Sequence, residues 1–238
     1  MTGQESKVRK QRRLEDILNR LEEAISYASI QTYPRSDHPD SSQRGTSFQV
    51  LIQIVVSQRA TLENERLAAK RLFNRFKTPS ELAAASVSEI AELIRPAGLQ
   101  RMKAAAIKAI AREVLDRYKG NLDVLRELPL EQVRQELLRL PKVGPKTADC
   151  MLELGFGLPV LPVDANVHRV ARRLGFAPKD AGTQAVQTAI ENLLPEDVEV
   201  YRRMHTFLLA LGKYFCKAKP KCEKCPVGDL CSVLGEEK

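Results

Sequence analysis

Apolar residues recur along most of the chain at spacings of three and four residues, the period of an amphipathic helix. Ile107, Ile110 and Val114, for example, share one face of a segment that Gly120 ends. Residues 48–56 are apolar nearly all round and are compatible with a strand, but the apolar residues that follow keep helical spacing. We therefore expect an all-α protein without strand hairpins or internal repeats.

The same pattern places the individual helices. It predicts them over residues 14–27, 48–56, 62–76, 81–94, 104–118, 121–128, 130–140, 146–154, 165–174, 184–194 and 198–215. A polar segment that is rich in basic residues precedes the first helix and is expected to be frayed. Residues 33–45 contain two prolines, several serines and a glycine, which is the composition of a loop, and we expect the chain to cross between domains there.

Composition and charge narrow the class of protein. The 238 residues, 43% of them hydrophobic, suffice for one large or two modest domains. A net charge of +8 favours a polyanionic partner, although many basic proteins bind nothing acidic. No segment reaches the roughly 18 apolar residues that cross a bilayer, and the N-terminus lacks the apolar core of a signal peptide. We expect a cytoplasmic monomer without membrane contact, associated with the nucleoid if the source is prokaryotic.

Residues 140–148, Leu-Pro-Lys-Val-Gly-Pro-Lys-Thr-Ala, join two of the predicted helices. Pro141 ends the first helix, Gly144 permits positive φ and close backbone approach, and Lys146 and Thr147 open the second helix. Backbone amides at such a helix start face an anion. A nucleotide-binding P-loop is excluded, because a proline precedes the lysine and a leucine stands where the first P-loop glycine belongs.

Downstream, a short extended link leads to Val163-Asp164-Ala165-Asn166. Asp164 is placed to cap the helix that follows.

Four of the five cysteines lie close together near the C-terminus. Cys216, Cys222, Cys225 and Cys231 form the pattern C-x5-C-x2-C-x5-C, which in a reducing compartment indicates metal ligation rather than disulfides. Zinc sites usually have two close pairs of ligands, and this pattern has only one. The spacing favours an iron–sulfur cluster over structural zinc. The lysines around these cysteines suit phosphate contacts or simple solubility.

The hairpin string, the aspartate after it and the cysteine pattern together resemble the endonuclease III family of helix-hairpin-helix DNA glycosylases, from about residue 48 to residue 231. The resemblance implies a two-domain fold, with a six-helix barrel over residues 46–158 and a cluster domain built from residues 1–45 and 159–238. It also implies a [4Fe-4S] cluster on the four cysteines. The first cysteine gap is five residues here and usually six in that family.

The resemblance assigns catalytic roles to Lys146 and Asp164. A glycosylase needs a flipped nucleotide, a nucleophile at C1′ and a carboxylate near the developing positive charge. A lysine nucleophile forms a Schiff base and permits β-elimination, so it implies lyase activity as well as base release. From spacing alone, Lys146 would be a phosphate contact and Asp164 a helix cap.

Further residues match the DNA contacts of that family. In Pro-Ala-Gly-Leu-Gln at 96–100, Leu99 corresponds to an apolar wedge that fills the gap of the flipped nucleotide, although spacing alone allows a core leucine. In Ser-Gln-Arg-Ala-Thr at 57–61, Gln58 and Arg59 lie in a second insertion loop, where the enzymes for oxidised pyrimidines typically have Ala-Gln. Asn166 stands where endonuclease III usually has histidine and adenine glycosylases have asparagine. The remaining candidate DNA contacts are Lys142, Gly144 and Thr147.

These observations predict a bifunctional DNA glycosylase and abasic-site lyase of base excision repair that acts on oxidised pyrimidines. Its partner would be duplex DNA that contains a damaged base or an abasic site. Arg59 and Asn166 suggest an alternative within the same superfamily, a mismatch or uracil glycosylase. A second alternative is a non-catalytic helix-hairpin-helix DNA-binding module, which the presence of both Lys146 and Asp164 disfavours.

Overall fold

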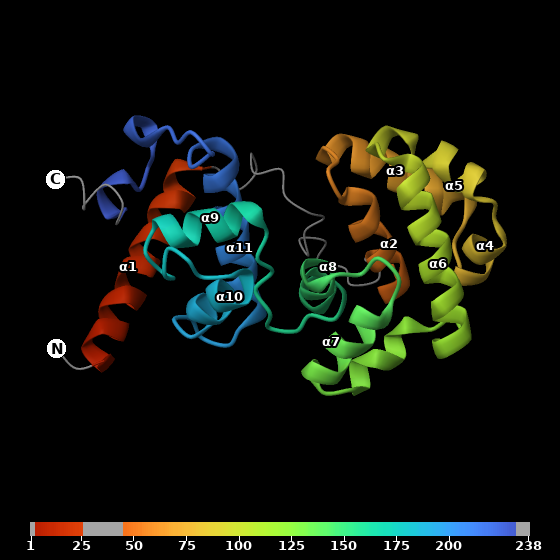
Figure 1. The fold of residues 1–238 in the computed structure, drawn as a ribbon, viewed down its shortest axis with the longest axis horizontal. Helices are drawn as coiled ribbons and strands as arrows, with labels where there is room; N and C mark the ends of the chain where they lie inside the picture. The colour runs from red at the N-terminus through yellow and green to blue at the C-terminus, as the bar shows by residue number, and fades with distance from the viewer. Residues whose placement is uncertain (1–2, 26–44, 232–238) are drawn as a thin grey trace. The chain divides into compact units, whose positions relative to one another are not determined.

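The computed structural model describes residues 3–25 and 45–231, and all regular secondary structure in these ranges is helical (Figure 1). The expectation of an all-α fold is confirmed. The chain divides into two compact units, Met1–Gln31 with Pro159–Lys238 and Thr32–Leu158. The interpretation of residues 46–158 as a six-helix barrel domain stays a prediction. No helix within the described ranges is long and apolar enough to cross a membrane.

The unit Thr32–Leu158 is organised around the helix that the sequence predicted over residues 48–56, and this prediction is confirmed. This helix, α2 (Ser47–Ser57), contacts α3, α6, α8, η4 and η5, so most of its side chains are buried. Thr46 and Gln49 form a capping box that begins it. The other elements of the unit are α3 (Leu62–Arg75), α4 (Pro79–Ala84), α5 (Val87–Leu93), η3 (Arg95–Ala97), α6 (Gln100–Tyr118), η4 (Leu122–Glu127), α7 (Leu130–Arg139), α8 (Pro145–Cys150) and the π-helical turn η5 (Met151–Gly155).

The prediction of one helix over residues 81–94 was wrong, because the segment is divided into α4 and α5. Ser86 begins α5 and accepts a hydrogen bond from the backbone N–H of Glu89, whose carboxylate accepts one from the backbone N–H of Ser86. This reciprocal pair satisfies the amides of a new helix start and makes the break favourable. A serine followed three residues later by glutamate is the sequence signal for it.

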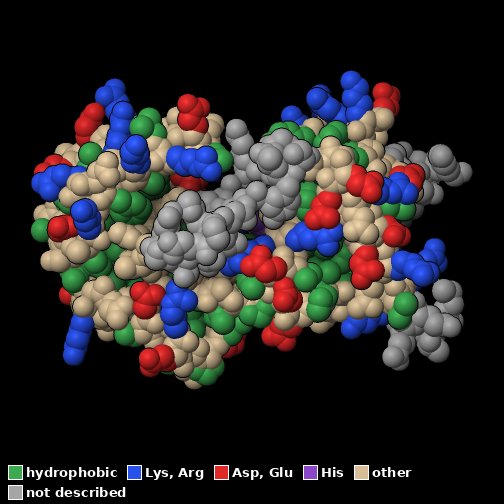
Figure 2. Space-filling view, turned by 180° about the vertical axis from the view of Figure 1, so that it is seen from behind, with side chains coloured by type: hydrophobic (Ala, Val, Ile, Leu, Met, Phe, Trp, Pro, Cys, Tyr) green, Lys and Arg blue, Asp and Glu red, His purple; other side chains and the backbone are tan. Residues whose placement is uncertain are grey.

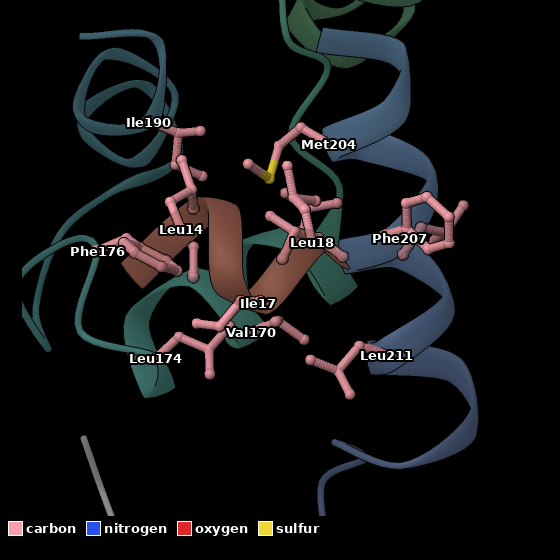
Figure 3. Packing of buried hydrophobic residues seen from close by; sticks show 14 of the residues in the cluster. Leu14, Ile17, Leu18, Val170, Leu174, Phe176, Ile190, Met204, Phe207 and Leu211 are labelled. Atoms are coloured by element: carbon pink, nitrogen blue, oxygen red, sulfur yellow. The ribbon is translucent and has the colours of Figure 1, made fainter. Parts of the chain in front are cut away.

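The second unit contains α1 (Gly3–Ala24), α9 (Ala165–Arg173), α10 (Thr183–Glu191), α11 (Val198–Tyr214) and the 3-10 turns η6 (Cys222–Lys224) and η7 (Gly228–Leu230). Leu14, Ile17 and Leu18 of α1 lie in one core with Val170 of α9 and Leu211 of α11 (Figure 3). The N-terminal helix and the C-terminal segment therefore share one hydrophobic core. Ile17 and Leu18 follow Leu14 by three and four residues, so the three side chains form one buried stripe along α1.

The start of α1 differs from the expectation. The helix begins at Gly3 rather than near residue 14, because the polar residues before Leu14 contain no proline and continue the helical hydrogen bonding. The predicted end of this helix at residue 27 and nearly all of the predicted loop 33–45 lie outside the described residues.

Candidate functional site

Buried side chains and an ion pair fix the turn between α7 and α8. Leu140 and Val143 are buried on either side of it, and Val143 donates its backbone N–H to the carbonyl of Leu140 at 3.2 Å. Arg134 of α7 forms an ion pair with the buried carboxylate of Asp149 on α8. Breaking a buried pair of this kind typically costs about 3–5 kcal/mol, so the two arms are strongly tied together. Lys142, exposed at the tip, has φ +63°.

Gly144 is the N-cap of α8, and its geometry corrects one expectation. Its φ is −96°, so the left-handed residue of the turn is Lys142 and not the glycine. A Cβ atom built on Gly144 would meet nothing within 4 Å. Glycine is a favourable N-cap residue, and the absence of a side chain also leaves the first-turn amides open to an external group.

Lys146 and Thr147 follow in the first turn of α8. Lys146 is half-buried and Thr147 is buried. The hydroxyl of Thr147 accepts a long hydrogen bond of 3.5 Å from the side-chain amide of Gln58. The structure therefore brings the predicted insertion loop at 57–61 next to the hairpin.

Arg59 and Leu99 mark the two insertion loops. Arg59 is exposed and has φ +55°, and Leu99 has φ +50° at the N-cap of α6. Leu99 is 44% exposed, so the interpretation as a core leucine is wrong. Left-handed backbone is uncommon for a bulky residue such as leucine.

Left-handed backbone is concentrated at the predicted DNA contacts. Among the described non-glycine residues, positive φ occurs at Arg59, Leu99, Lys119 and Lys142. Lys119 lies at the C-cap of α6, where the left-handed conformation is common. The other three were each predicted to contact DNA. Because such conformations cost on the order of 1–3 kcal/mol, they persist only where surrounding structure fixes them.

Asp164 caps α9, as expected. Its Oδ1 accepts hydrogen bonds from the backbone N–H groups of Asn166 and Val167, both at 2.8 Å. Its Oδ2 accepts a hydrogen bond from the side-chain amide of Asn166 at 3.3 Å. The cap therefore fixes the rotamer of the carboxylate, and Asn166 contacts the oxygen that the cap does not use.

Asn166 is itself held by Arg169. The guanidinium of Arg169 donates to Oδ1 of Asn166 at 2.9 Å, to the carbonyl of Gly212 at 3.0 Å and to the carbonyl of Cys216 at 2.8 Å. A Cβ atom on Gly212 would approach Cβ of Asn166 to 2.7 Å, so this glycine allows α11 to pack closely against α9. Hydrogen bonds thus connect the first cysteine of the C-terminal loop to Asp164.

The four C-terminal cysteines line one cavity of about 160 Å³ together with apolar side chains such as Leu211 and Phe215. Within the described ranges, no three Cys, His, Asp or Glu side chains converge closely enough to hold a single metal ion. A tetrahedral zinc ion brings its sulfur ligands to within about 2.3 Å of one point. Four thiols around a cavity of this size fit a group of several atoms.

The loop around this cavity is anchored from two helices. Arg173 of α9 donates to Sγ of Cys216 at 3.5 Å and to the carbonyl of Lys217 at 2.6 Å. Nη1 of Arg20 on α1 donates to both carboxylate oxygens of Asp229, each at 2.6 Å. Burial raises the pKa of the Cys225 thiol, and the three other cysteines raise this pKa further.

The candidate residues belong to two different units. Lys146 and the insertion loops lie in Thr32–Leu158, whereas Asp164, Asn166 and the cysteines lie in the other unit. On the face that Figure 2 draws, lysine and arginine side chains are interspersed with aspartate and glutamate. The basic side chains do not form one continuous area on that face.

Sequence reasoning did not single out Lys103, the Arg134–Asp149 pair, Arg169 or Arg173. A signal existed for Lys103, because it falls on the apolar face of its helix, four residues before Ile107. Arg169 and Arg173 share one face of α9 by their spacing of four residues, but nothing in the pattern shows that this face meets the cysteine loop.

Comparison with known proteins adds a family match. Residues 52–196 match the model of the HhH-GPD superfamily base excision DNA repair proteins. Endonuclease III of Thermotoga maritima is 35% identical over 210 residues, which cover 88% of this chain and 91% of that protein.

Two solved structures are similar to the whole fold. A trapped covalent intermediate of endonuclease III with DNA has a TM-score of 0.74 and 30% identity, covering 95% of this chain and 98% of that one. A thermostable thymine-DNA glycosylase has a TM-score of 0.71 and 26% identity, covering 96% of this chain and 99% of that one.

Substitution of Gly144 tests whether the hairpin amides meet a ligand. Gly144→Ala should fold normally, because its φ is negative and the added Cβ meets no atom. We expect its affinity for DNA with an abasic-site analogue to fall at least about tenfold, which corresponds to roughly 1.4 kcal/mol, because the methyl group obstructs approach to the first-turn amides. Fluorescence anisotropy with a labelled duplex measures it.

Gly182→Ala is the matched control. Gly182 is also an exposed N-cap glycine with negative φ, and a Cβ there likewise meets nothing within 4 Å. Both variants lose the same N-cap preference, a fraction of about 1 kcal/mol in stability, but Gly182→Ala should bind DNA like the parent. Equal affinities of the two variants for DNA would show that the hairpin turn is not part of the binding site.

Proposed function

Because the chain belongs to the HhH-GPD superfamily of base excision DNA repair proteins and is a DNA glycosylase of the endonuclease III type, we propose that it is bifunctional. It releases oxidised pyrimidines from duplex DNA and then cleaves the strand at the resulting abasic site. The observation that carries this proposal is Lys146, a half-buried amine in the first turn of α8, beside an N-cap glycine with open space around it.

Lys146 would supply the nucleophile. Attack of its neutral amine on C1′ forms a C–N bond as the bond to the base breaks, and the base leaves with the electron pair and takes up a proton. The sugar ring then opens to a Schiff base, which allows loss of a C2′ proton and departure of the 3′ phosphate. The related endonuclease III structure that was trapped as a covalent intermediate with DNA supports a nucleophile on the protein.

Asp164 would stabilise the positive charge that develops on the sugar. Its carboxylate is already fixed by the two backbone hydrogen bonds of the α9 cap, so no reorientation is needed during the reaction. A preorganised carboxylate lowers the free energy of the transition state more than that of the bound substrate, which is the condition for catalysis.

Cys216, Cys222, Cys225 and Cys231 would hold a [4Fe-4S] cluster, since all four line one cavity of suitable size. When bound, the cluster would fix the lysine-rich loop around it by tying four points of the chain together. Arg173 and the Arg20–Asp229 pair already anchor this loop from α9 and α1. The loop would then offer its lysines to DNA phosphates.

Leu99 would fill the space that the flipped nucleotide leaves, and Gln58 and Arg59 would enter the duplex from the second loop. Their exposure or partial exposure supports these roles. At the hairpin, phosphate would be bound by Lys142, Gly144 and Thr147. Asn166 would contact DNA near Asp164.

A mismatch glycosylase is the second candidate. The similarity to a thermostable thymine-DNA glycosylase supports it, as do Arg59 and Asn166, which depart from the usual pattern of endonuclease III. Duplexes that carry thymine glycol, uracil, or thymine opposite guanine separate the two by the base that is released.

Covalent trapping tests the roles of Lys146 and Asp164. With borohydride and abasic-site DNA, the parent should form a covalent complex, because the Schiff base is reducible. Lys146→Gln should abolish both trapping and strand cleavage. Asp164→Asn should slow base release by at least about a hundredfold while leaving DNA binding and stability near the parent, because asparagine caps a helix almost as well. Gel analysis measures the amounts of trapped and of cleaved DNA strand.

One result of this experiment would favour the mismatch glycosylase instead. If the parent releases a base but yields no trapped complex, the amine is not the nucleophile and the monofunctional mismatch activity is favoured.

Metal content tests the cysteine site. The anaerobically purified parent should be yellow-brown and contain about four iron atoms per chain, as expected of a thiolate-bound [4Fe-4S] cluster. Cys225→Ser should lose the colour, the iron and thermal stability. Cys150→Ala is the control, because Cys150 is buried in the other unit and should leave the iron content unchanged. One zinc per chain without iron would show that the site holds zinc.

A further inference from the structure

Lys103 is an internal lysine in the unit that carries the insertion loops. It is the fourth residue of α6 and is only 2% exposed, on the same face as Ile107 and Ile110. Lysine is almost never buried to this extent unless its ammonium group is paired. The apolar stem packs within the unit, and the positive charge has to be compensated by groups inside it.

The ammonium group of Lys103 donates hydrogen bonds to two backbone carbonyls. One belongs to Val56 and the other to Ala97, each at 2.8 Å. Val56 lies in the last turn of α2, three residues before Arg59, and Ala97 ends η3, two residues before Leu99. A single cation therefore joins the starting points of both insertion loops.

The carbonyl of Val56 is one for which a cation is favourable. Val56 lies in the last turn of α2, where carbonyl groups have no intrahelical donor and carry partial negative charge. Glu65 of α3, which is 4% exposed, adds a negative charge nearby and accepts a hydrogen bond of 3.2 Å from Gln53. This carboxylate raises the pKa of Lys103, which burial lowers more strongly.

We propose that Lys103 is a positioning residue for nucleotide extrusion, which holds the loop of Gln58 and Arg59 and the turn of Leu99 at one fixed spacing. This inference rests on the proposed function. Arg59 and Leu99 both occupy left-handed backbone, and such strain persists only where the surrounding structure leaves the chain no alternative. Without the ammonium group, two buried carbonyls lose a donor and both loops can relax independently.

The same helix provides a matched comparison. Lys108, five residues after Lys103, also donates its ammonium group to a backbone carbonyl, that of Ala85 in the break between α4 and α5. No predicted DNA contact lies in that break. Lys108→Met therefore removes the same kind of interaction from the same helix without touching an insertion loop, whereas Lys103→Met removes the one that joins the two loops.

The experiment measures extrusion separately from chemistry. A duplex with the fluorescent base 2-aminopurine beside the lesion reports unstacking, and an abasic site in single-stranded DNA reports Schiff-base formation without any need for a wedge. Lys103→Met should reduce the fluorescence rise and the single-turnover rate of base release from duplex by at least about tenfold. Trapping on the single strand should stay within about twofold of the parent. Lys108→Met should preserve all three.

A double substitution tests whether Lys103 acts through the wedge. In a Leu99→Ala background, Lys103→Met should reduce extrusion much less than it does in the parent, because the turn that it positions no longer carries the wedge. Full additivity of the two substitutions would contradict the proposal. So would equal losses on duplex and single strand, or the same loss in Lys108→Met.

Two outcomes remain distinguishable. If no variant or parent forms a trapped complex, the proposed lyase function fails, but the 2-aminopurine signal still decides the role of Lys103. If Lys103→Met does not fold, Lys103→Arg takes its place, because arginine keeps the buried charge but places its donors farther from α6. A folded Lys103→Arg that extrudes the nucleotide like the parent would overturn the requirement for an ammonium group at this point.

Discussion

The constraint on which the unit Thr32–Leu158 depends is the left-handed backbone of three non-glycine residues, Arg59, Leu99 and Lys142. Each stands on a loop whose base is held by buried groups. The buried side chains of Leu140 and Val143 anchor the hairpin turn, and Lys103 binds carbonyls at the base of the other two loops. Buried groups at the base of each loop therefore hold these residues in the left-handed conformation.

In the other unit, one set of helices fixes both the carboxylate of Asp164 and the cysteine loop. The α9 cap orients Asp164, and Asn166 and Arg169 extend the hydrogen bonding from it to the carbonyl of Cys216. Gly212 makes this possible, because α11 could not approach Asn166 with any larger residue. The arrangement means that the cysteine loop and the catalytic candidate are stabilised by the same helix.

Helical periodicity predicted most of the fold, because most helices carry a continuous buried stripe. It missed the break at Ser86, where two local hydrogen bonds outweigh a pattern that continues across them. It also missed the buried ion pair between Arg134 and Asp149, since the sequence separation of ion-pair partners is not visible in a pattern of hydrophobicity. The candidate roles of Lys146 and Asp164 came from the family resemblance, because spacing alone predicts a phosphate contact and a cap. The cap proved correct and is compatible with catalysis, as one oxygen serves it.

We propose that base release and strand cleavage occur at one amine, that of Lys146. The most direct test compares strand cleavage of a thymine glycol duplex with and without alkali after incubation with the protein. Monofunctional enzymes leave an intact abasic strand that only alkali breaks, whereas a Schiff-base mechanism cleaves it without alkali. We predict that most released bases are accompanied by alkali-independent cleavage. Base release with cleavage that appears only after alkali would contradict the claim.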